Sequence, residues 1–190
     1  AGEALSIELD GSCEFTVELT RRLTIFAPIH DGPSRGELIK TGPGHLVLAG
    51  ANRFSGGTTV RDGRLQLARS EVLYDLGTVQ LDPSGGVLEL LSGVTETIGA
   101  LSGGSATKGN VILNNASLLV GAAEVASVYR GVISGAGGSV IKIGNAEQTF
   151  TNVAHEFSGG LTVRGGWLAV EAAYSSPEAV IPAVGNSPLG

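Results

Sequence analysis

The sequence predicts an all-β protein folded as a right-handed parallel β-helix, and three features of the chain lead to this prediction. The ten residues that start at Phe54 return almost unchanged from Phe157, 103 residues later. Apolar and polar residues alternate with a period of two in many short runs. Glycine makes up 30 of the 190 residues and often occurs in pairs between those runs. A thin repeated unit cannot bury its apolar face alone and has to stack on its neighbours.

The alternating runs predict short strands with one buried and one exposed face. Five such runs are clear: Leu5–Leu9, Phe15–Leu19, Arg64–Leu67, Thr78–Leu81 and Val87–Leu90. Gly121–Ala126 could instead form a single turn of helix. Because similar units recur in one chain, stacked parallel strands are favoured over hairpins, and the preferred crossover hand makes the coil right-handed. At roughly 20 to 25 residues per coil, the chain would form about eight or nine coils.

The two copies extend beyond the matching ten residues. Upstream, Glu37–Gly42 aligns with Ser139–Gly144, and downstream Arg64–Leu67 aligns with Trp167–Val170. We therefore predict one elongated domain over residues 1–190 that contains two repeat copies. They are placed at residues 29–77 and 132–190, with an insertion in the second copy and with the chain cut in mid-repeat.

The repeated residues are predicted to form equivalent corners in different coils, with the chain turning directly after each phenylalanine. Glycine adopts positive φ without steric cost, so the glycine pairs are expected to supply that conformation at the corners. The structural repeat positions are Phe54, Ser55, Gly56, Gly57 and Val60 in the first copy and Phe157, Ser158, Gly159, Gly160 and Val163 in the second.

Composition excludes several classes of function. The net charge of −6 and the scattered arrangement of 12 basic residues argue against nucleic acid and anionic membranes as partners, because both require clustered Lys and Arg. No apolar stretch approaches the roughly 20 residues of a membrane-spanning helix, so we expect no direct membrane insertion. Cys13 is the only cysteine and is expected to be a small buried residue near Phe15.

The sequence lacks recognisable catalytic and metal-binding patterns. His155 and Glu156 begin like a zinc-protease motif, but Gly159 stands where the second histidine ligand would be. His30, His45 and His155 do not recur at the repeat spacing, and the 18 acidic residues are dispersed. We therefore expect no catalytic residues, no metal and no cofactor. A carbohydrate-active β-helix enzyme remains an alternative, and clustered carboxylates in a cleft would indicate it.

Residues 42–60 contain a Gly-x-Gly turn, a leucine-rich strand and the sequence Gly-Ala-Asn-Arg-Phe-Ser-Gly-Gly-Thr, followed by Thr-Val. This pattern resembles the autotransporter-associated β-strand repeat, the passenger-associated transport repeat of Gram-negative autotransporters. The second copy keeps the residues from Phe157 to Val163 but has His155 and Glu156 in place of Asn52 and Arg53.

The resemblance implies a passenger segment exported by type V secretion and displayed on the cell surface or shed, with a C-terminal outer-membrane barrel in the full-length protein. Together with the missing catalytic patterns, it leads us to expect a non-catalytic scaffold that also serves as an adhesin or virulence surface. The expected partners are surface molecules of a host cell or a neighbouring bacterium. Two alternatives stay open, a spacer or folding aid for secretion only and the carbohydrate-active enzyme.

Overall fold

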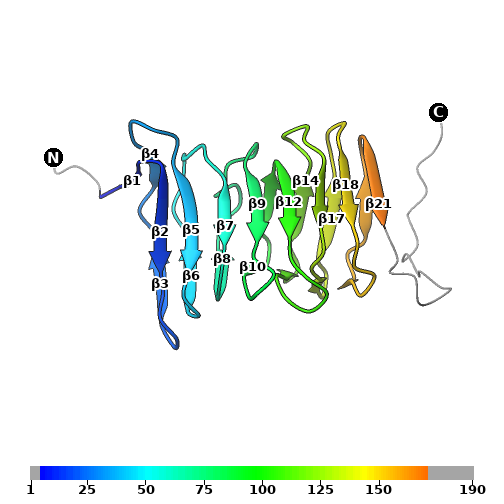
Figure 1. The fold of residues 1–190 in the computed structure, drawn as a ribbon, viewed down its shortest axis with the longest axis horizontal. Coiled ribbons are helices and arrows are strands. Elements are labelled where there is room, and N and C mark those ends of the chain that lie inside the picture. Colours follow the sequence, from blue (N-terminus) through cyan, green and yellow to red (C-terminus); the bar gives the residue numbers. More distant parts are fainter. Residues whose placement is uncertain (1–4, 171–190) are drawn as a thin grey trace.

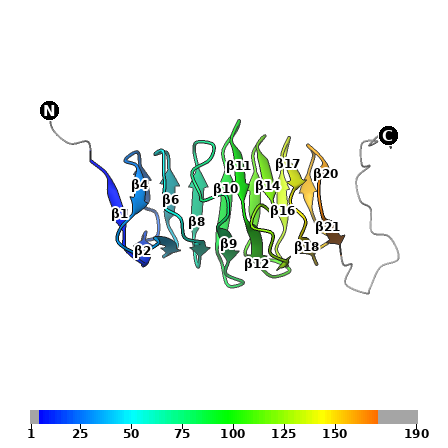
Figure 2. The ribbon, with the colours of Figure 1, turned by 90° about the horizontal axis from the view of Figure 1, so that it is seen from above.

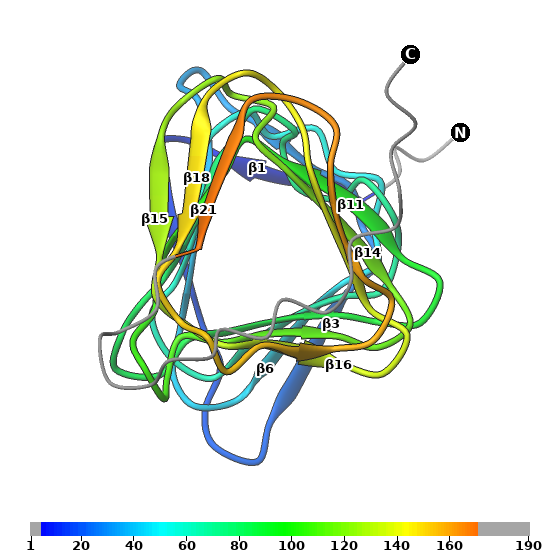
Figure 3. The same cartoon turned by 90° about the vertical axis from the view of Figure 1, so that its right-hand side faces the viewer.

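The chain wraps into a triangular coil whose regular elements are all strands. The computed structural model describes residues 5–170, and within them no helix is present. The coils stack into a rod with the N-terminal strands at one end and the C-terminal strands at the other (Figures 1 and 2). Viewed down the rod, each coil has three sides joined by corners (Figure 3).

The first side is an eight-stranded sheet that runs the length of the rod. Its strands follow in the order β2 (Ser12–Thr16), β5 (Glu37–Thr41), β7 (Thr58–Val60), β9 (Thr78–Leu81), β12 (Ala100–Gly103), β15 (Ser127–Tyr129), β18 (Glu147–Phe150) and β21 (Trp167–Val170).

The second side is a seven-stranded sheet, with one strand from each turn. It contains β3 (Arg22–Ile25), β6 (His45–Leu48), β8 (Arg64–Leu67), β10 (Val87–Leu90), β13 (Val111–Leu113), β16 (Ile133–Gly135) and β19 (Glu156–Phe157).

The third side is regular only in part. Near the N-terminal end β1 (Ile7–Leu9) pairs with β4 (Ile29–Asp31), and the next coil adds only an isolated bridge between His30 and Arg53. A four-stranded sheet then forms from β11 (Thr95–Ile98), β14 (Ser117–Val120), β17 (Ser139–Lys142) and β20 (Leu161–Val163).

Every pair of neighbouring strands in these sheets is parallel. In the interior, the register places similar side chains of successive coils directly above one another. Leu46 pairs with Leu65, and Leu65 pairs with Leu88. These pairings make successive coils 19 and 23 residues long. The inward side chains are mainly Leu, Val and Ile and are almost fully buried, so the core is a continuous column along the rod axis.

The predicted parallel β-helix is confirmed, including its hand. Seen from the C-terminal end, the chain passes from the eight-stranded to the seven-stranded sheet and then to the third side, anticlockwise, while it advances towards the viewer (Figure 3). The described residues form about seven turns, as the seven-stranded sheet shows. The prediction of eight or nine counted all 190 residues, so it included residues outside the described range.

Two local predictions need correction. Gly121–Ala126 forms a hydrogen-bonded turn rather than a helical turn, with Glu124 at a φ of 56°. The strand expected at Phe15–Leu19 lies earlier, as β2, because the chain turns a corner after Val17. In both cases the chain turns a corner of the coil at this point, so the short run of residues does not form the expected helical turn or strand.

The two repeat copies follow the same local path but on different sides of the triangle. The first copy starts on the eight-stranded sheet with β5, whereas the second starts on the four-stranded sheet with β17. From β5 the chain completes four turns to β15 and then passes two more sides to β17. The 103-residue separation therefore corresponds to four and two-thirds turns, and the second copy is rotated by one side.

The expectation of positive φ holds at four of the six glycine pairs, through Gly103, Gly104, Gly137, Gly160 and Gly166, and fails at the other two. Gly160 has a φ of 90°, but Gly56 and Gly57 do not have positive φ. At Gly56 the constraint is close approach, because an added Cβ would overlap the carbonyl oxygen of Gly36 on the preceding coil. Gly57 is less restricted, with Thr78 O at 3.1 Å from the position of such a Cβ.

Candidate binding surface

The repeat residues mostly face the interior or join one coil to the next. Phe54 and Phe157 are both buried in the core. Ser55 donates its hydroxyl to Asp31 of the preceding coil at 2.6 Å, and this bond is the main cause of the lowered pKa of Asp31. The Ser158 hydroxyl accepts a hydrogen bond from the Gly137 amide at 2.8 Å. A partner outside the rod would therefore find few of these groups available in the first copy, whereas Ser158, Gly159 and Val163 of the second copy are exposed.

The valines of the repeat differ between the copies. Val60 is completely buried in β7, whereas Val163, in β20, is 49% exposed. The difference accompanies the position of β20 on the last described coil, where no further described strand covers it.

A buried lysine stabilises the corner at the start of each copy. The Lys40 ammonium group is fully buried and donates to the carbonyl oxygens of Thr41 at 2.7 Å and Gly42 at 2.6 Å. It also donates to Asp62 O at 3.1 Å, one coil further along. Burial lowers the pKa of Lys40, but the three carbonyl oxygens provide the acceptors that the ammonium group needs.

Lys142 repeats this arrangement in the second copy and is 1% exposed. Its ammonium group donates to the carbonyl oxygens of Ile143, Gly144 and Gly165. Sequence reasoning aligned the two lysines but gave them no role. The sequence does carry one signal for this role. Lysine recurs in both copies at a position where the alternation of apolar and polar residues predicts a side chain facing the core.

Side chains replace missing strand pairing on the irregular third side. The Asn52 side chain accepts from the Ile29 amide at 3.1 Å and donates to the Val72 carbonyl at 3.1 Å, so it connects three coils. Glu96 in turn accepts from the Val72 amide at 3.1 Å and the Leu73 amide at 2.6 Å. These two residues satisfy backbone groups that have no ladder partner there.

Glu96 is fully buried, and burial raises its pKa to about 8. The folded protein therefore keeps a proton that the unfolded chain releases between pH 4.5 and about 8, and the free energy of unfolding should fall across that window. We expect a slope of up to about 1.4 kcal/mol per pH unit, which Glu96→Gln removes. Urea unfolding at pH 5, 6, 7 and 8 measures it, with exposed Glu18→Gln as the control. An unchanged slope in Glu96→Gln would contradict the assignment.

The three histidines do not gather into a site. His30 contacts Asp31 O through Nδ1 at 2.9 Å, His45 lies half-buried in β6, and His155 accepts from the Ile133 amide at 3.0 Å. Within residues 5–170, no group of three or more His, Cys, Asp or Glu residues could hold a metal ion. Cys13 is partly buried and packs against the core, so the expectation of a small core residue is close to the finding.

Glu71 lies close enough to Asp75 and Glu96 for their charges to interact. Burial and then the charge of Asp75 raise the pKa of Glu71, whose neighbour Glu96 is occupied by backbone amides. The paired acids of glycan hydrolysis need an open cleft that admits the substrate. A hollow lined by residues 83, 103–106, 130 and 151–153 has no acidic residue in its lining.

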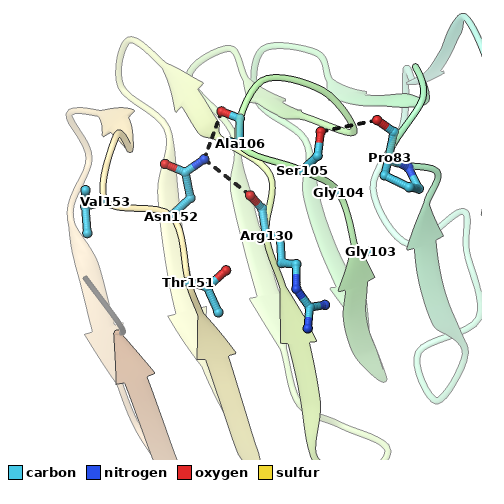
Figure 4. A pocket seen from close by; sticks show the side chains of 9 residues that line it. All are labelled: Pro83, Gly103, Gly104, Ser105, Ala106, Arg130, Thr151, Asn152 and Val153. Atoms are coloured by element: carbon cyan, nitrogen blue, oxygen red, sulfur yellow. Dashed lines mark hydrogen bonds between the residues drawn. The ribbon is translucent and has the colours of Figure 1, made fainter. Parts of the chain in front are cut away.

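That hollow, of about 650 Å³, lies at the corner after the eight-stranded sheet (Figure 4). The loop over residues 104–110 overhangs it, and the Asn152 amide donates to Ala106 O at 3.2 Å and Arg130 O at 3.3 Å. Ser105 joins the loop to Pro83 O at 3.2 Å. Three coils thus hold the loop in place, and the lining is mainly backbone and small side chains.

The outer face of the eight-stranded sheet continues from this hollow. Thr59, Gln80, Ser102 and Val128 alternate with buried residues on four successive strands and so point outward. A second, smaller hollow of about 290 Å³ lies beside Val128. We call this outer face, with its two hollows, the polar face. In the rod it lies largely between the two repeat copies.

The fold defines a class: a right-handed parallel solenoid in which the aromatic repeat residues Phe54 and Phe157 lie in the core. Residues 38–67 and 140–170 match the family model of the passenger-associated-transport repeat. The chain is 37% identical over 134 residues to the adhesin BmaC autotransporter of Brucella suis biovar 1 (strain 1330). That match covers 70% of this chain and 4% of the relative. The chain belongs to the autotransporter passengers that carry this repeat. No solved structure matches it.

The described part of the chain contains no helix long and apolar enough to cross a membrane.

Proposed function

We propose that this chain is a non-catalytic rod segment of a surface-displayed or secreted adhesin, in which the repeats build the rod and the polar face contacts the partner. The orientation of the repeat residues carries the proposal. Phe54, Ser55 and Lys40 are engaged inside the rod or between coils, so the repeats serve folding. The similarity to a protein named as an adhesin autotransporter supports the remainder.

The chemistry of the polar face indicates the class of partner. Its central residues Thr59, Gln80, Ser102 and Val128 carry no charge, and each hollow adds one charged residue, Arg130 or Glu147. Recognition therefore depends mainly on hydrogen bonds and shape. Surface molecules of a host cell or a neighbouring bacterium, rich in hydroxyl and amide groups, fit such a face. Binding of this kind should depend only weakly on salt.

The test is adhesion by cells that display the full passenger. We expect Ser102→Lys combined with Val128→Lys to reduce adhesion about tenfold or more, because two buried charges at the contact disfavour binding. The matched control places lysines at Thr95 and Thr162 on the four-stranded sheet, and it should adhere like the parent. Circular dichroism confirms that both variants fold.

Two outcomes would support the alternatives. If both lysine variants adhere normally, and replacement of residues 1–190 by an unrelated β-helix of equal length also has no effect, the segment is a spacer for secretion only. Turnover of a polysaccharide that disappears in Glu71→Gln would instead support the carbohydrate-active enzyme.

A further inference from the structure

His155 occupies the position that Asn52 holds in the first copy, 103 residues earlier. Asn52 accepts a hydrogen bond from the Ile29 amide at 3.1 Å, and His155 accepts one from the Ile133 amide at 3.0 Å. In each case a side chain joins its coil to the preceding one. Both side chains therefore serve as hydrogen-bond acceptors for the preceding coil. Only the imidazole of His155 can gain a proton near neutral pH.

The hydrogen bond fixes the protonation state of His155. A backbone N–H can only donate, so Nδ1 must carry its lone pair towards Ile133 and the proton must be on Nε2. Nε2 is buried and has no hydrogen-bond partner among the described residues. A second proton would place two donors against each other at Nδ1 and would leave a buried cation.

The surroundings of His155 also disfavour a cation. The imidazole lies between Phe150, with ring centroids 5.5 Å apart, and Phe157, at 6.2 Å. Both rings meet it at a steep angle, with interplanar angles of 71° and 52°, rather than face to face. Burial accordingly lowers the pKa of His155 below its ordinary value of 6.5.

The ionisable groups on the strands packed against His155 would not neutralise a positive charge on its imidazole. The Tyr129 hydroxyl is buried and donates to Gly109 O at 2.7 Å. Arg130, Glu147 and Glu156 are exposed to solvent, and none of them makes an ion pair with His155. The imidazole therefore responds to pH through its own bond to Ile133.

We propose that His155 is an acid-sensitive connection between coils, which holds the second repeat copy at neutral pH and releases it when the imidazole is protonated. The sign follows from the lowered pKa: the stabilisation is complete above pH 6.5 and is lost as the pH falls through the folded-state pKa. The hydrogen bond between Asn52 and Ile29 in the first copy persists over the same pH range. Acid thus loosens one end of the rod.

Hydrogen exchange of the full chain at pH 7.4 and 5.0, corrected for intrinsic rates, tests this proposal. We expect protection of the Ile133 amide to fall roughly tenfold on acidification, as loss of one net hydrogen bond implies, while the Ile29 amide does not lose protection. In His155→Asn and His155→Gln, which keep an acceptor, the ratio between the two pH values should return to about one.

His45→Asn is the control histidine variant and should keep the acid effect. Equal protection of Ile133 at both pH values in the wild-type chain would overturn the proposal, as would the same acid loss in both His155 variants. If neither variant folds, the comparison of the Ile133 and Ile29 amides within the wild-type chain still decides.

Discussion

Replacing Gly86 with alanine is expected to destabilise the rod by about 3 kcal/mol or more. Gly86 lies just before β10, where its Cα faces the preceding coil, and an added Cβ would overlap the carbonyl oxygen of Val60. This oxygen also accepts the Asp82 amide at 2.9 Å, so it cannot move without breaking a bond between coils. The coils would have to separate locally.

The matched control is the adjacent Gly85. An alanine Cβ there would meet only the Asp62 side chain, with Oδ1 at 2.9 Å, and a flexible side chain can move aside. We expect Gly85→Ala to change stability by less than about 1 kcal/mol. Urea midpoints followed by circular dichroism compare the two variants. Equal midpoints would show that close approach of the backbones is not what requires glycine at this corner.

Replacing Lys40 with methionine is expected to cost about 3 kcal/mol, although it removes a buried charge. Methionine fills the same space, but it leaves the carbonyl oxygens of Thr41, Gly42 and Asp62 without the donor that now serves all three. The Thr41 oxygen keeps the Val17 amide as a second donor at 3.1 Å, whereas the oxygens of Gly42 and Asp62 each lose the lysine donor. We expect this loss to outweigh the gain from removing the charge.

Lys142→Met should have a similar effect because its ammonium group occupies the equivalent corner. The two sites are more than four turns apart, so the double variant should show nearly additive losses. The exposed Lys108→Met is the control and should be close to neutral. Stability unchanged by Lys40→Met would mean that the buried lysine satisfies no essential backbone group.

The sequence alone determined the class of fold and the family. The repeated segments from Phe54 and Phe157, the period-two alternation and the glycine pairs were sufficient, because stacked parallel strands are the arrangement in which such a pattern buries its apolar face. Right-handedness followed from the general preference for right-handed crossovers. The repeat pattern itself was specific enough to identify the family, which the match over residues 38–67 and 140–170 confirms.

Only the tertiary structure decided how the copies and their polar residues are arranged. The rotation of the second copy by one side depends on the accumulated lengths of coils, which vary from 19 residues upward and cannot be read from local pattern. Lys40 and Glu96 are buried and His155 is half-buried, and each bonds to a backbone group of another coil, more than 20 residues away in sequence. Local alternation shows which residues face inward, whereas the partners of a buried polar group exist only once the coils are stacked.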